Sequence, residues 1–175
     1  MQITSIIRRA AQVNPNGIAT IYENRQQTWT QMLDRVARLA AGLQELGIQP
    51  GDRVALLSLN SDRFIEYFFA TVWAGGAMMP MNIRWAAAEC AYALNDAGAE
   101  ILIVDEAFKG VADELRAQVP GLKNIIYCGD SDTPEGMENY EDIVASNAPA
   151  TDADRSGDDL AGIFYTGGTT GFPKG

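Results

Sequence analysis

The clearest hydrophobic pattern in the chain lies between Thr30 and Gly47, where apolar residues recur every three or four positions. This spacing predicts an amphipathic helix whose apolar stripe packs on a core. Thr30 is suited to cap the amino end of this helix, and Gly47 is suited to end it. A Pro-Gly turn follows, and the continuous apolar run 53–60 predicts a strand that is buried on both faces.

The same alternation of helix and strand continues along the chain. Helical spacing occurs in residues 61–76, 85–98 and 107–121, and short apolar runs typical of strands occur in 77–82, 100–106 and 123–129. Upstream, residues 18–30 predict two short strands joined by a turn at Glu23 and Asn24. These elements together predict an α/β fold in which a mostly parallel sheet is flanked by helices on both faces.

The alternating pattern breaks between residues 130 and 158, where Ser, Thr, Pro, Gly and acidic residues replace the apolar runs. Ten acidic residues and a single basic one, Arg155, lie between Asp130 and Asp159, so this stretch holds most of the net charge of −10. We interpret 130–158 as an acidic connection over the surface. Residues 160–166 then resume as an apolar strand.

Composition excludes several functional classes. With 47% hydrophobic and 21% charged residues the chain is typical of globular proteins, and it has no basic excess to attract a nucleic acid. It has no histidine and two cysteines, Cys90 and Cys128, which predicts two buried free thiols in a cytoplasmic protein rather than a zinc site. The longest uncharged run, 67–83, is too short to predict a transmembrane helix.

The last eleven residues, 165–175, contain four glycines, three threonines and a lysine directly after a predicted strand. Such a loop favours phosphate binding, because glycine lets backbone N–H groups approach an anion and Lys174 adds positive charge. The spacing excludes a Walker loop, since Pro173 lies five residues after Gly168 and Gly175 follows the lysine. A Rossmann G-x-G pattern does not occur anywhere in the sequence.

The loop sequence YTGGTTGFPKG resembles the signature loop of the adenylate-forming (AMP-binding) enzymes, although Gly167 stands where serine is common. Residues 39–61 and 71–105 are similar to two further motifs of this family, in the same order. Within the second motif, the residues from Met81 onward look most like those of fatty-acid and aryl CoA ligases. Its landmark residues Arg84 and Glu89 are better interpreted as structural than as catalytic.

The resemblance implies a two-step reaction. A carboxylate attacks the α-phosphate of ATP to give an acyl-adenylate and pyrophosphate, and the thiol of coenzyme A then displaces AMP. The loop would hold the β- and γ-phosphates of ATP, and the Thr166 hydroxyl would face the accompanying Mg²⁺. The residues implied for phosphate binding are Thr166, Gly167, Gly168, Thr169, Thr170, Gly171 and Lys174. No catalytic residue is assigned within this chain.

The resemblance also implies that residues 1–175 are the N-terminal portion of a larger adenylation domain, with the rest of the enzyme absent and no activity from this portion alone. We expect the complete enzyme to be a cytoplasmic acid–thiol ligase that uses ATP and CoA. Its expected substrate is a carboxylic acid, in the first place a fatty acid, and a homodimer is a candidate assembly. Two alternatives stay open: a non-catalytic binding or assembly module, and an adenylating enzyme that passes its acyl group to a carrier protein.

Overall fold

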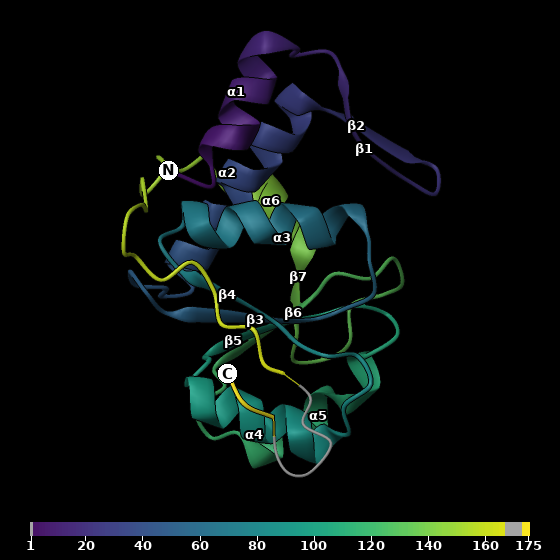
Figure 1. Ribbon diagram of the computed structural model, residues 1–175. Helices are drawn as coiled ribbons and strands as arrows, with labels where there is room; N and C mark the ends of the chain where they lie inside the picture. Colours follow the sequence, from purple (N-terminus) through teal and green to yellow (C-terminus); the bar gives the residue numbers. More distant parts are fainter. Residues whose placement is uncertain (1, 167–172) are drawn as a thin grey trace.

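The computed structural model of the protein describes residues 2–166 and 173–175 (Figure 1). A parallel sheet lies in the middle, with α2, α3 and α6 over one face, α4 and α5 over the other, and α1 packed on α2. The helices are α1 (Ser5–Val13), α2 (Trp29–Glu45), α3 (Asp62–Trp73), α4 (Ala87–Ala97), the 3-10 turn η1 (Lys109–Val111), α5 (Ala112–Gln118) and α6 (Tyr140–Ser146). The predicted fold class is therefore confirmed.

Five parallel strands form the sheet, in the order β4-β3-β5-β6-β7, and β1 and β2 form a separate antiparallel hairpin. The strands are β1 (Ile18–Tyr22), β2 (Arg25–Thr28), β3 (Arg53–Leu57), β4 (Ala77–Pro80), β5 (Ile101–Val104), β6 (Asn124–Tyr127) and β7 (Glu138–Asn139). The chain leaves β3 toward β4 and then crosses back to β5 on the other side of β3. The strand order reverses there, and in such sheets ligands bind beyond the carboxyl ends of the strands.

Two hydrophobic clusters fill the layers on either side of the sheet. In β3, Val54 and Leu56 belong to the cluster beneath α2 and α3, whereas Ala55 and Leu57 belong to the cluster above α4 and α5. Successive residues of a strand point to opposite faces, so an unbroken apolar run is needed where both faces are covered. The continuous apolar strands of the sequence therefore match the two-sided burial of the sheet.

The start of α2 differs from its prediction. Thr28, not Thr30, caps this helix: its hydroxyl accepts the Gln31 N–H at 3.3 Å, and the Gln31 side chain accepts the Thr28 N–H at 2.8 Å. Thr30 lies inside the first turn and donates its hydroxyl to the Pro15 carbonyl at 3.0 Å. The prediction that Thr30 caps the helix was wrong, because β2 ends at Thr28 and the helix begins at the next residue. Gly47, with φ of +98°, follows the end of the helix as predicted.

The acidic stretch 130–158 also differs from a plain surface connection, because β7 and α6 form within it. Tyr140 and Val144 on α6 are buried in the larger core, and Glu141 forms ion pairs with two arginines. The stretch lacks long apolar runs because a two-residue strand and a two-turn helix need few core residues. The helix α1, whose Ile7 is fully buried, has no counterpart among the predicted elements.

Other local predictions agree with the structure. The β1–β2 hairpin turns at Glu23 and Asn24, with Glu23 at a φ of +51°. Cys90 and Cys128 are free and buried, and burial first of all raises their pKa values to about 11 and about 12. Within residues 2–166 and 173–175, none of the helices has the length and apolar character needed to cross a bilayer.

Candidate phosphate-binding site

Residues 160–166, predicted as a strand, do not form one: they lie beside the outer edge of β4 and pair with it only through an isolated bridge. The Met78 N–H donates to the Ala161 carbonyl at 2.9 Å, and the Ile163 N–H donates to the Met78 carbonyl at 2.8 Å. Gly162 forms a parallel bridge with Met78, so this segment runs in the same direction as the sheet strands. The loop therefore departs from the carboxyl edge of the sheet, where α/β proteins bind their ligands.

The two arms of the loop are joined at its base. The Thr166 N–H donates to the Lys174 carbonyl at 2.8 Å, and the Lys174 N–H donates to the Thr166 carbonyl at 3.3 Å, as in an antiparallel pair. The structure thus brings together two of the seven predicted site residues. The other five lie outside the described residues and stay predictions: Gly167, Gly168, Thr169, Thr170 and Gly171.

Lys174 and Thr166 both have groups available for a ligand. The side chain of Lys174 forms no ion pair with any residue that the structure describes, and both residues are exposed. The Thr166 hydroxyl donates to the Lys174 carbonyl at 3.2 Å, which leaves the lone pairs of its oxygen for a metal ion or a hydrogen-bond donor. An exposed ammonium beside a closed loop base suits a phosphate group.

Aromatic side chains pack at the base of the loop. The hydroxyl of Tyr165 donates to the Asp96 carboxylate at 2.5 Å, and the rings of Tyr165 and Trp85 meet edge to face with centroids 6.3 Å apart. Burial, followed by the hydrogen bond to Asp96, raises the pKa of Tyr165. Gly175 lies against the same ring: a Cβ at this position would be 2.8 Å from two ring carbons.

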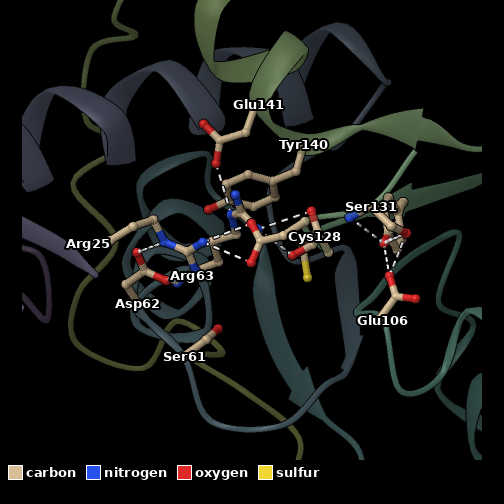
Figure 2. A network of polar contacts seen from close by, with 12 residues as sticks. Arg25, Ser61, Asp62, Arg63, Glu106, Cys128, Ser131, Tyr140 and Glu141 are labelled. Carbon is tan, nitrogen blue, oxygen red and sulfur yellow. Dashed lines mark hydrogen bonds and ion pairs between the residues drawn. The ribbon is translucent and has the colours of Figure 1, made fainter. Parts of the chain in front are cut away.

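A second polar cluster, the arginine network, lies away from the loop between the hairpin, α2, α3 and α6 (Figure 2). Arg25 binds Asp62 at 2.9 Å, and Arg63 binds Glu141 at 2.8 Å. Arg35 links Glu141 to the fully buried Glu66. Each of these carboxylates has a cationic partner, so the network is arranged to join elements rather than to bind a free ion.

A cleft of about 500 Å³ lies at the carboxyl ends of β3, β5 and β6. Two of its carboxylates already have donors: Asp105 accepts the Leu59 N–H at 2.7 Å, and Glu106 accepts hydrogen bonds from Lys109, Ser131 and Tyr127, two of which Figure 2 draws. Because these groups are engaged within the protein, the cleft offers a weaker case for an anion or metal site than the loop does. Among the described residues no group of three Asp, Glu, Cys or His side chains could hold a metal ion.

Sequence reasoning missed the arginine network. Its partners are 31 to 106 positions apart along the chain, as in the pairs Arg35–Glu66 and Arg35–Glu141. Their spacing gives no local signal, because each residue taken alone is typical of a charged surface position. Glu89, by contrast, has the structural role expected of it, since its carboxylate accepts the Ala86 N–H at 2.8 Å at the start of α4.

Comparison with known proteins decides the family. The sequence profile of the family described as AMP-binding enzyme matches residues 7–175, which is nearly the whole chain. The chain belongs to the AMP-binding enzyme family. The chain is 33% identical over 182 residues to a 2-succinylbenzoate–CoA ligase of Arabidopsis thaliana, and the match covers 99% of the chain and 32% of that relative.

Other relatives agree on the class of enzyme. A long-chain-fatty-acid–CoA ligase of Mycobacterium tuberculosis is 35% identical over 174 residues, covering 97% of this chain and 33% of the relative. The crystal structure of an anthranilate CoA ligase in complex with anthranoyl-AMP superposes with a TM-score of 0.93 at 27% identity, covering 99% of the chain and 33% of that structure. The chain therefore spans about a third of the length of the relatives that it matches.

Proposed function

We propose that this chain is the N-terminal portion of an AMP-forming acid–thiol ligase, which activates a carboxylic acid with ATP and transfers it to coenzyme A. One observation carries the proposal: the loop base closed by Thr166 and Lys174 lies at the carboxyl edge of a parallel sheet, with the Lys174 side chain exposed. Membership of the AMP-binding enzyme family supports it, and so do its relatives, which are CoA ligases.

In this proposal the chain contributes phosphate binding rather than the whole active site. The Lys174 ammonium pairs with the β- and γ-phosphates and offsets the charge that gathers on the leaving pyrophosphate. The backbone N–H groups of the glycines and the Thr169 and Thr170 hydroxyls would surround the same phosphates. Their role rests on the sequence resemblance, because they lie outside the described residues.

The residues that the structure describes could hold Mg²⁺ only together with phosphate and water ligands, because they supply a single protein oxygen. Mg²⁺ in nucleotide sites usually keeps several waters and takes one or two protein oxygens beside the phosphates. The Thr166 hydroxyl supplies one such oxygen at the loop base. We propose that the Thr166 hydroxyl would help to hold Mg²⁺, which would supply charge neutralisation at the phosphates, and that any acidic ligand would come from residues beyond these 175.

The acid substrate that we propose is a fatty acid. The Mycobacterium tuberculosis relative is named for long-chain fatty acids, while the Arabidopsis relative and the superposed crystal structure are named for aromatic acids. The residues described in this chain form the phosphate side of the site and do not select among these acids. A cytoplasmic location and a homodimer stay predictions.

The test begins with the reading frame that encodes the chain. We expect it to continue beyond codon 175 into further family motifs, and the encoded protein to catalyse ATP–pyrophosphate exchange that depends on a carboxylic acid. Fatty, benzoic and anthranilic acids form the substrate panel, and CoA-dependent release of AMP separates a CoA ligase from an enzyme that loads a carrier protein. A frame that closes at codon 175, or a full-length protein without exchange on any acid, would overturn the proposal.

A further inference from the structure

We propose that Tyr165 is a positioning residue for the phosphate loop, and that Asp96 and Trp85 hold it in place. This inference rests on the proposed function, because it assigns Tyr165 a part in presenting Thr166 and Lys174 to ATP. The tyrosine directly precedes Thr166, and Thr166 is paired through its backbone with Lys174. Whatever fixes Tyr165 therefore fixes both arms of the loop.

Three contacts from separate parts of the chain meet on this one side chain. The Asp96 carboxylate of α4 accepts the Tyr165 hydroxyl at 2.5 Å, and the Trp85 ring, which precedes α4, stands at 85° to the tyrosine ring. From the returning arm, Gly175 lies so close to the ring that a Cβ would be within 2.8 Å of it. The ring is thus held between the helix layer and the second arm of the loop.

The placement of Asp96 is unfavourable for its own helix. It is the second-last residue of α4, where the helix dipole disfavours negative charge, and no basic residue lies in the last turn. Asp96 is also exposed, so water could satisfy its carboxylate without any help from Tyr165. Neither burial nor helix stability therefore accounts for Asp96 at this position. The orientation that its hydrogen bond gives to Tyr165 explains it better.

The benefit to ATP binding is preorganisation. Thr166 and Lys174, which are already paired, lose less conformational freedom on binding a phosphate than two unpaired residues would. Freeing Tyr165 from Asp96 should therefore weaken ATP binding and leave the affinity for the carboxylic acid unchanged. A purely structural contact would instead lower stability without this selective effect on ATP.

The kinetic test uses the full-length protein and ATP–pyrophosphate exchange. We expect Tyr165→Phe and Asp96→Ala each to raise the KM for ATP about five-fold, the size of one charged hydrogen bond near the surface. The KM for the acid should not change. Tyr22→Phe is the matched control, because it removes a hydroxyl from the β1–β2 hairpin, on the other side of the sheet from α4, which carries Asp96 (Figure 1). Equal ATP KM values for Tyr165→Phe and Tyr22→Phe would overturn the inference.

A conservative series separates positioning from simple loss of structure. Asp96→Asn keeps an oxygen that can accept the Tyr165 hydroxyl, so its KM for ATP should stay within about two-fold of wild type. The double variant Tyr165→Phe/Asp96→Ala should be no worse than either single variant, because both remove the same bond. Additive effects would show that the two residues act separately and would contradict the proposed pair.

A second measurement does not depend on activity. Hydrogen–deuterium exchange, followed by mass spectrometry of peptides that cover residues 163–175, reports on the N–H groups of Thr166 and Lys174 that pair the arms. We expect faster exchange in Tyr165→Phe and Asp96→Ala but not in Tyr22→Phe. Unchanged deuterium exchange in both Tyr165→Phe and Asp96→Ala would overturn the inference, even if ATP–pyrophosphate exchange by the wild type confirms the ligase. Faster exchange in a protein that proves inactive would support the positioning role and refute only the ligase.

Discussion

At the scale of single residues, charge has two opposite uses in this molecule. Lys174 is exposed at the base of the loop without an ion pair to any described residue. Glu66 is fully buried and accepts hydrogen bonds from Arg35, Gln27 and Tyr140. A free surface charge costs little and can serve a ligand, whereas a buried charge needs partners at every oxygen. These two residues should therefore respond differently to substitution.

Lys174→Ala in the full-length protein should slow adenylate formation about 100-fold, the cost of removing one group that stabilises developing charge. The affinity for the carboxylic acid should stay close to wild type, because the proposed role of Lys174 is to hold the phosphates. Single-turnover formation of the acyl-adenylate at saturating ATP measures the first effect, and acid binding by calorimetry measures the second. Unchanged turnover at saturating ATP would contradict the role of this lysine.

Glu66→Gln should lower the free energy of unfolding by about 3 kcal/mol, because Arg35 then loses a buried charge partner. The matched control is Asp34→Asn on α2, which breaks an exposed pair with Arg38 and should cost about 0.5 kcal/mol. Urea unfolding of both variants at pH 7 gives the comparison. Equal losses of unfolding free energy in the two variants would contradict the argument that stability depends more on a buried charge than on an exposed one.

At the scale of elements, close packing of α6 on α2 explains a glycine inside a helix. Gly42 lies in the middle of α2, where glycine is the least favourable residue apart from proline. A Cβ at Gly42 would be 2.1 Å from the Cγ2 atom of Ile143 on α6. The helix therefore gives up some intrinsic propensity so that α6 can approach it. Without that approach, the partly buried Ile143 would not reach the larger core.

Gly42→Ala should destabilise the protein by about 1 kcal/mol, because overpacking against Ile143 outweighs the gain in helix propensity. The sign should reverse in an Ile143→Ala background, where the space for the new methyl group is free. Gly121→Ala is the control, since no atom lies within 4 Å of its Cβ position. Thermal unfolding of the single and double variants measures the coupling, and the same sign in both backgrounds would refute the packing argument.

At the scale of the whole molecule, the arginine network joins elements that the sheet does not connect. It links α2, α3 and α6 with the hairpin and the loop after β6, and Figure 2 shows the part of it around Arg25, Arg63 and Glu141. Hydrogen bonds from Arg25, followed by those from Arg63, lower the pKa of Asp130 below 3.8. Burial of Glu141 opposes its ionisation, but hydrogen bonds and charges from Arg35 and Arg63 outweigh this and lower its pKa below 4.5.

Stability should consequently fall with acid. A carboxylate whose pKa is lower in the folded state contributes stability above its unfolded pKa and loses that contribution as the pH falls through the folded value. Glu106, whose pKa is lowered to about 2 chiefly by its hydrogen bond with Lys109, extends this range downward. The urea midpoint should therefore be nearly constant from pH 7 to about 5 and should decline steadily toward about pH 2.

Glu141→Gln isolates the contribution of the network to this acid response. The variant should be less stable by about 1 kcal/mol at pH 7, with allowance for solvent screening, and should lose less stability than wild type on acidification. Glu45→Gln is the control, because Glu45 is exposed and forms no ion pair with any residue that the structure describes. An acid response that is identical in Glu141→Gln and wild type would exclude this linkage.

Local patterns in the sequence were enough to predict most of the sheet and its covering helices. Apolar runs such as 53–60 and 100–106 predict buried strands, because burial on both faces requires continuous apolar residues. The loop residues 165–175 likewise indicate phosphate chemistry through composition alone. Predictions were weaker where elements are short: α1, β7 and α6 have nine, two and seven residues, too few for a clear period.

The sequence by itself therefore determined the α/β class and the family, and it predicts which residues hold phosphate, because each of these depends on neighbours along the chain. Only the tertiary structure decided that Thr28 rather than Thr30 caps α2, that Asp96 reaches Tyr165, and that Arg35 joins Glu66 to Glu141. These contacts join positions up to 106 residues apart, or depend on where one element gives way to the next. Folding brings such partners within hydrogen-bond distance, and no local pattern records that they meet.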